Sequence, residues 1–190
     1  MRPKRFSGVT LVELMAVLAV LIILVVMAVP SFSDFFDRHR VRGAAEDIAS
    51  MISNARAEGV KNDLDVSIAA TGSGTAWCIG GNAATAPTGG NPAGGAADCD
   101  CSDAAQCRIS GQRMAVDSTD YRGVSIGALP ASLTFNSTLG MIVPLGSREI
   151  PLVSASGKYE VTVEVNALGQ ARACTKPDKP TMTGVAVCTP

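Results

Sequence analysis

The chain has 190 residues, enough for one domain with an accessory element and too few for two ordinary domains. Its 16 Lys and Arg against 17 Asp and Glu give a net charge of −1, which argues against a strongly basic nucleic-acid binder and against an acidic disordered tail. Residues 9–29 contain one charged side chain, Glu13, whereas residues 30–190 are more polar and carry all six cysteines. This distribution predicts a short apolar anchor followed by a modest folded domain.

The apolar segment 9–29 is long enough to cross a membrane. As a helix, its 21 residues would span about 31 Å, the thickness of a bilayer core. Residues 1–8 carry three positive charges and no negative one, a pattern that keeps the amino terminus in the cytoplasm and the carboxyl end outside. A secretory signal and a plain anchor are the alternatives. The sequence Ala28-Val29-Pro30 is a poor signal-peptidase site because a proline follows directly.

Glu13 is the unusual residue of this segment, because a carboxylate in hydrocarbon costs on the order of 3 kcal/mol unless it finds a partner. A cut between Gly8 and Val9 would create an ammonium group at Val9 one helical turn before Glu13. The two charges could neutralise each other, or pair between neighbouring subunits. The alternative is a glutamate near the membrane edge whose side chain reaches the headgroups.

The string Gly8-Val9-Thr10-Leu11-Val12-Glu13-Leu14-Met15 resembles the type III signal of type IV pilins and type II secretion pseudopilins. The resemblance implies that a prepilin peptidase removes residues 1–8 as a leader and methylates the new amino terminus at Val9, where the family usually has Phe. Loss of the leader would leave a formal charge of −4. Pro30 falls where pilin helices commonly carry a kinking proline.

Residues 30–60 are predicted to continue the helix, because Pro30 bends a helix without always ending it. Apolar residues recur at three- and four-residue steps with one longer gap, and Gly59 is a plausible stop signal. The apolar stripe comprises Phe32, Phe35, Phe36, Ala45, Ile48, Ile52 and Ala55. The charged residues at the predicted membrane exit could contact lipid headgroups or neighbouring subunits, or form a solvated face; they are Asp34, Asp37, Arg38, His39, Arg40 and Arg42.

Residues 61–190 are predicted to form a β-rich head, an antiparallel sheet or small sandwich packed on the helix, in an α+β fold. The candidate strands are 64–70, 76–79, 108–116, 124–129, 132–136, 141–144, 159–166, 170–174 and 184–188. Val161, Val163 and Val165 alternate with polar residues and should face the core. The uncharged, Gly-rich segment 80–97 is predicted to be a mobile surface loop.

Six cysteines on the outer side of a membrane predict disulfides in an oxidising compartment, although six cysteines allow 15 pairings. The favoured pair is Cys174 with Cys188. Cys78 would then pair into the cluster of Cys99, Cys101 and Cys107. A metal site built from that cluster is the alternative, but Cys-Asp-Cys lacks the usual zinc spacing. No metal or other cofactor is predicted.

Two further segments, 133–141 and 163–174, resemble the GspH/FimT branch of these pilin-like proteins, which implies its fold of a long helix with a β-rich head. The sequence shows no catalytic motif, so we expect no enzyme. The expected role is a minor pilin of the type IV pilus, which waits in the inner membrane with its head in the periplasm and then enters the fibre. Its expected partners are other pilins, the prepilin peptidase and the assembly platform.

Two other roles are open. One is a minor pseudopilin of the type II secretion system, and the other is DNA capture by a FimT-like minor pilin. For DNA capture the resemblance would require a Gly-Arg-x-Arg turn, whereas this chain has Gly169-Gln170-Ala171-Arg172 and so lacks one arginine. Arg172, with Lys176 and Lys179, would then supply the phosphate contacts.

Overall fold

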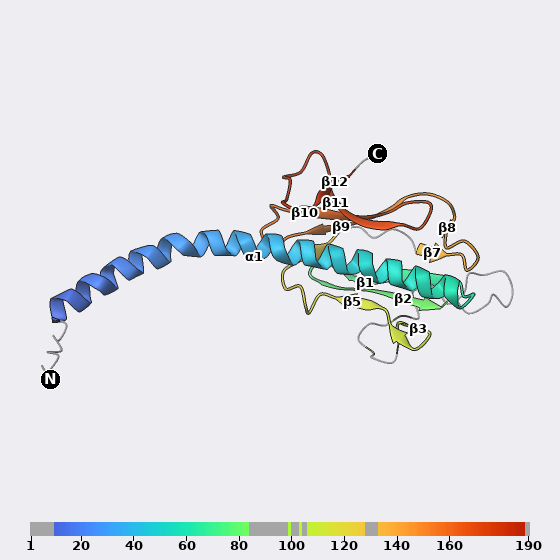
Figure 1. Cartoon of the computed structure of the whole chain (residues 1–190), viewed down its shortest axis with the longest axis horizontal. Helices are drawn as coiled ribbons and strands as arrows, with labels where there is room; N and C mark the ends of the chain where they lie inside the picture. Colours follow the sequence, from blue (N-terminus) through green and yellow to red (C-terminus); the bar gives the residue numbers. More distant parts are fainter. Residues whose placement is uncertain (1–9, 84–98, 100–102, 104–105, 128–132, 189–190) are drawn as a thin grey trace, which may run out of the picture. The chain divides into compact units, whose positions relative to one another are not determined.

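The computed structural model describes residues 10–83, 99, 103, 106–127 and 133–188 (Figure 1). Gly8 and Val9 lie outside the described residues, as does segment 84–98. The chain divides into two compact units, one ending at Phe36 and the other running from Asp37 to the carboxyl end. Each unit is described by itself below, and the second is called the head.

Helix α1 runs from Leu11 to Lys61 and is continuous through Pro30, so this proline does not end the helix. The kink expected at Pro30 stays a prediction. The helix ends in a left-handed turn at Asp63, whose φ is 53°. The N–H of Leu64 donates to the carbonyl of Gly59 at 2.9 Å, and the N–H of Asp63 donates to the carbonyl of Val60 at 3.4 Å. This is the hydrogen-bond pattern of a Schellman cap.

The helix ends within one residue of the predicted end at 60, but Gly59 is not its stop signal, because Gly59 lies inside α1. A Cβ atom at this position would lie 2.6 Å from Cγ2 of Val66 and 2.9 Å from the carbonyl oxygen of Leu64. The glycine therefore allows the chain that leaves the helix to pack closely back against it.

The described residues after α1 form two five-stranded sheets and a small hairpin. The first sheet has the order β5 (Ala115–Asp117), β2 (Ala76–Ala83), β1 (Val66–Ser73), β7 (Leu133–Phe135) and β8 (Ile142–Val143). The second has the order β12 (Ala186–Val187), β11 (Ala171–Thr175), β10 (Glu160–Val165), β9 (Arg148–Val153) and β6 (Ser125–Ile126). Strands β3 (Arg108–Ile109) and β4 (Gln112–Arg113) form the hairpin.

These sheets confirm the predicted α+β fold with an antiparallel β-rich head, apart from one parallel pair, β11 with β12. Strand β9 was not predicted; Pro151 lies inside it, and proline is disfavoured within strands. In the structure Pro151 pairs opposite Thr162, and its carbonyl accepts a hydrogen bond from Gly127. The single strand expected at 108–116 is divided by a turn with positive φ at Ser110 and Gly111.

The expected loop at 80–97 also begins later than its composition suggested, because Gly80 to Ala83 belong to β2 and pair with β1. A Cβ at Gly80 would lie 2.3 Å from the sulfur of Cys99 and 2.8 Å from that of Cys107. Glycine is needed there so that the strand can pass against these two sulfur atoms. A glycine count alone does not distinguish this close approach from a loop.

One continuous core joins the carboxyl-terminal half of α1 to both sheets. The buried face of the helix comprises Val41, Ala44, Ala45, Ile48, Ala49, Met51, Ile52 and Ala55. Val161, Val163 and Val165 of β10 are fully buried, as their alternation predicted. Phe32, Phe35 and Phe36, however, are 51–60 % exposed and do not belong to this core. The predicted apolar stripe from Phe32 to Ala55 is therefore not one surface. Its phenylalanines are exposed in the first unit, and its residues from Ala45 onward are buried in the head.

A polar contact joins the segment between β5 and β6 to the part of α1 that belongs to the head. The hydroxyl of Tyr121 donates to the carboxylate of Asp47. The ring of Tyr121 also stacks on Trp77, with centroids 6.5 Å apart. Burial, and then the hydrogen bond to Asp47, raises the pKa of Tyr121 well above its ordinary value of 10.0.

Replacing Ile52 by alanine should lower the free energy of unfolding of the head by about 3 kcal/mol, because a fully buried side chain would leave a cavity. Urea denaturation of the full chain in detergent would measure this loss. Phe35→Ala is the matched control, since its exposed ring should change that free energy by less than about 0.5 kcal/mol. Equal losses in the two variants would contradict the division of the stripe.

Tyr121→Phe should destabilise the head by about 1 kcal/mol at neutral pH, because it removes the hydrogen bond to Asp47. The raised pKa means that the folded state favours the protonated phenol. This contribution is complete below pH 10.0, the ordinary pKa of tyrosine, and is lost as the pH rises through the higher pKa of the folded protein. The difference in free energy of unfolding between wild type and variant, measured by urea titration, should therefore shrink as the pH rises above 10.0. A difference that does not depend on pH would contradict this account.

Candidate functional site

The first turn of α1 is capped by Thr10, whose hydroxyl oxygen accepts a hydrogen bond from the N–H of Glu13 at 3.3 Å. The carbonyl of Thr10 accepts from the N–H of Leu14 at 3.1 Å. Threonine followed three residues later by glutamate is the sequence pattern of a capping box. Our sequence reasoning missed this role of Thr10, although the pattern is visible in the sequence.

Glu13 lies in this first turn of α1, with its side chain exposed. A negative charge is stabilised there by the N–H groups at the amino-terminal end of the helix. The predicted partner of Glu13, the amino group of Val9 after a cut at Gly8, lies outside the described residues. The pairing of these two charges stays a prediction.

Beyond Glu13, α1 exposes a large apolar surface. The large apolar side chains from Leu11 to Met27 are 50–74 % exposed. Helix α1 is the one helix in the described residues that is long and apolar enough to cross a membrane. A core helix of a soluble protein would pass the same test, but its apolar stretch would be buried, and this one is not. Lipid or other apolar helices could cover this surface.

The cations considered for phosphate contacts all pair with glutamates of the second sheet. Arg172 lies opposite Glu164 and donates to its Oε2 from Nε at 3.1 Å and from Nη2 at 2.9 Å. The ammonium of Lys176 lies 2.7 Å from Glu149, and that of Lys179 lies 2.8 Å from Glu160. Hydrogen bonds to these glutamates raise the pKa of both lysines. The carboxylates thus offset the positive charge expected to attract DNA.

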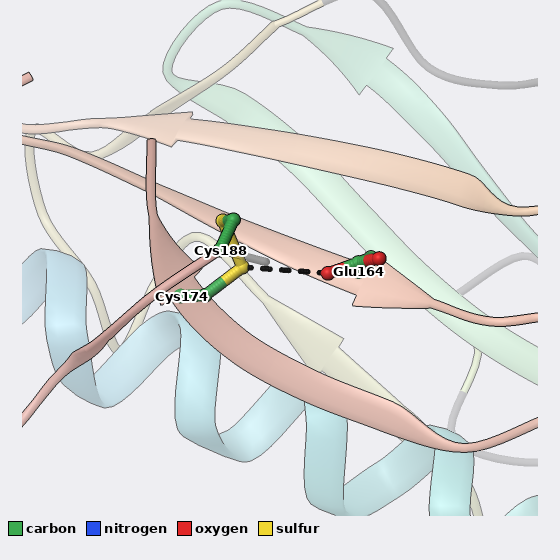
Figure 2. A group of neighbouring side chains, drawn as sticks. All are labelled: Glu164, Cys174 and Cys188. Carbon is green, nitrogen blue, oxygen red and sulfur yellow. Dashed lines mark hydrogen bonds between the residues drawn. A yellow bond between two sulfur atoms is a disulfide. The ribbon is translucent and has the colours of Figure 1, made fainter. Parts of the chain in front are cut away.

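A disulfide joins Cys174 and Cys188 beside these ion pairs, with an S–S distance of 2.07 Å, and this is the pair that the sequence favoured. Its sulfur atoms lie next to the carboxylate of Glu164, which is 3.7 Å from Sγ of Cys174 (Figure 2). A disulfide sulfur carries no proton to donate and is no thiolate. The three side chains therefore do not form a metal site, although their potential ligand atoms lie within 4.8 Å of one another.

A second group of cysteines lies against β2. Cys99 and Cys107 form a disulfide with an S–S distance of 2.03 Å and are both buried. Cys78 packs against them and is also disulfide-bonded. Among the described cysteines none is free, so Cys99 and Cys107 are not available as thiolate ligands for the alternative metal site.

Two turns meet at the side chain of Arg56 near the carboxyl end of α1. Its Nε donates to the carbonyl of Gly140 at 2.6 Å. A Cβ at Gly169 would lie 2.3 Å from this carbonyl oxygen and 2.8 Å from Nε of Arg56. Both glycines have positive φ angles, 62° at Gly140 and 79° at Gly169. Gly169 therefore has a packing role, and the sequence alone did not identify Arg56 as its partner.

Comparisons with known proteins agree with these features. Residues 44–169, more than half of the chain, match the model of the family described as type II transport protein GspH. Residues 3–29 match the prokaryotic N-terminal methylation motif, which covers the predicted cut after Gly8. This motif and the apolar helix are consistent with membrane anchoring.

Among solved structures, the chain is similar to the type IV minor pilin FimU of Pseudomonas aeruginosa PAO1 in two crystal forms. One form is 19 % identical, with a TM-score of 0.47, and the match covers 75 % of this chain and 92 % of FimU. The other is 18 % identical, with a TM-score of 0.43, and the match covers 72 % and 92 %. Comparison with curated proteins gives no match.

Proposed function

Because the chain belongs to the GspH family of pilin-like proteins, we propose that it is a minor structural subunit of the type IV pilus that helps to start or extend the fibre. The observation that carries this proposal is the unburied apolar surface of α1 from Leu11 to Met27, attached to a folded head. Lipid would cover this surface before assembly, and the helices of other pilins would cover it in the fibre. The head would wait in the periplasm, where its disulfides can form.

Glu13 would give the assembly its register. Transfer of the apolar helix from lipid to a bundle of similar helices changes its burial little, so apolar contact alone does not set an axial position. A carboxylate that must find an ammonium does set one, because an unpaired charge in that environment is costly. The amino group of Val9 in a neighbouring subunit would be the partner.

A minor pseudopilin of the type II secretion system is the second candidate, favoured by the description of the family model as a type II transport protein. Both roles use the same processing, anchor and fold. The identity of the neighbouring genes, for pilus assembly or for secretion, would discriminate between them.

We propose neither DNA capture nor enzymatic activity for this chain. Arg172, Lys176 and Lys179 each have a glutamate partner within 2.9 Å. DNA phosphates would have to displace these partners, which reduces the electrostatic gain of binding.

Mass spectrometry of the protein isolated from cells tests the processing on which the proposal depends. We expect a chain that starts at Val9, shortened by residues 1–8 and carrying one added methyl group. Replacing Gly8 by a bulky residue should leave the leader attached. A native protein that keeps residues 1–8, or that is released by a cut near Pro30, would contradict the proposal.

Glu13→Ala should leave membrane insertion intact and reduce the amount of the subunit in sheared filaments by roughly tenfold or more, because breaking a buried charge pair costs about 3–5 kcal/mol. Immunoblots of the membrane and filament fractions would measure both quantities. Asp34→Ala is the matched control, since it removes an acid from the same helix outside the first turn. Wild-type levels of the Glu13 variant in filaments would show that Glu13 does not set the register.

A further inference from the structure

Two turns of the head lie beside the first residues of its part of α1 (Figure 1). The turn between β9 and β10 contacts Asp37, whose Oδ2 accepts a hydrogen bond from the N–H of Ser156 at 3.1 Å. The turn between β5 and β6 contacts Arg40, whose Nη1 donates to the carbonyl of Arg122 at 3.5 Å. Residues far apart in the sequence thus meet at the end of the head that continues into the apolar half of the helix.

Four exposed cations gather at this end: Arg38, Arg40, Arg122 and Lys158, called here the basal cation cluster. The guanidinium carbon of Arg38 lies 5.4 Å from the centre of the Tyr159 ring, and the ammonium of Lys158 lies 5.3 Å from it. Both positive groups are therefore held at one aromatic side chain. The carbonyl contact with Arg40 brings Arg122 to the same end.

Fewer acids than cations lie at this end. Asp34, Asp37 and Asp120 are the acids on these segments, so the four cations outnumber the acids by one. About two turns further along α1, Glu46 pairs with Arg42 at 2.7 Å and Asp47 accepts the hydrogen bond from Tyr121. Several of the cluster's cations also have interactions within the chain. This end of the head is distinguished by its excess of positive charge and by its location.

The location is next to the predicted membrane segment. Phe32, Phe35 and Phe36 are exposed, and Arg38 follows Phe36 by two residues, about 3 Å along a helix. Aromatic and basic side chains next to an apolar stretch are typical of the point where a helix leaves a bilayer, because the basic groups reach the headgroup phosphates. Here Asp34 and Asp37 alternate with the aromatic and basic residues. Guanidinium groups bind phosphate through charge-assisted hydrogen bonds.

We propose that the basal cation cluster binds the headgroups of anionic phospholipids and so holds the head against the membrane before assembly. The inference rests on the membrane anchoring proposed above. Each Lys or Arg close to an anionic surface strengthens the attachment roughly fivefold. Screening by salt weakens such contacts, so the head would remain able to detach when the subunit enters a fibre.

The test uses the full chain reconstituted into vesicles of phosphatidylcholine, with or without added phosphatidylglycerol. Amide hydrogen exchange is measured at residues 119–123 and 155–159. In the wild type, exchange at both turns should be roughly fivefold slower or more when phosphatidylglycerol is present. In Arg122→Gln/Lys158→Gln this slowing should be lost. The control Lys61→Gln/Arg148→Gln, which removes two cations at the opposite end of the head, should keep it.

Flotation of the same samples separates the two proposals. The chain should float with both kinds of vesicle through its apolar helix, and failure to float with either would refute the anchoring itself. Flotation with both, but equal exchange in the two lipids, would refute the headgroup contact alone. Slowing that persists in Arg122→Gln/Lys158→Gln would also refute the headgroup contact. Slowing that occurs only within assembled filaments would refute it as well, because the cluster would then contact a neighbouring subunit.

Discussion

The burial of one face of α1 against both sheets is the interaction on which the rest of the head depends. Ile48 and Ile52 are fully buried at its centre, and the valines of β10 meet the same core. The strands are short, several with two or three residues, and isolated strands of that length are not stable in water. The helix gives them a common apolar surface, so the ladders form on it as one cooperative structure.

The described residues do not bury the amino-terminal half of the same helix. From Leu11 to Met27 its apolar side chains are exposed, and exposing that much apolar surface to water is unfavourable. The molecule is therefore incomplete without lipid or other subunits. The proposed anchoring, the register set by Glu13 and the basal cation cluster all follow from this need to bury the apolar helix. They concern its burial in lipid before assembly and its transfer to other helices in the fibre.

The carboxyl-terminal part of the head is held by covalent and ionic links that restrict what it can bind. The Cys174–Cys188 disulfide, with a sequence separation of 14 residues, stabilises the fold by about 3 kcal/mol through loop closure. The ion pairs of Arg172, Lys176 and Lys179 lie around it on the second sheet. Exposed ion pairs contribute little to stability, but they give each cation a carboxylate partner. Three residues that could serve as phosphate ligands by charge alone are thus part of a balanced surface.

The sequence by itself determined the features that depend on neighbours along the chain. These are the apolar helix with its single acid, the helix that continues past Pro30, the alternating valines of β10 and the Thr10 cap, whose pattern was present but overlooked. Only the tertiary structure decided which contacts form between distant segments. In the folded chain the three phenylalanines are exposed while Ile52 is buried, and Pro151 lies inside a strand. Gly80 packs closely against two cysteines, and Arg172 pairs with Glu164. The physical reason is that helix and strand periodicity arise from local geometry, whereas burial and charge pairing depend on which surfaces meet after the chain has folded.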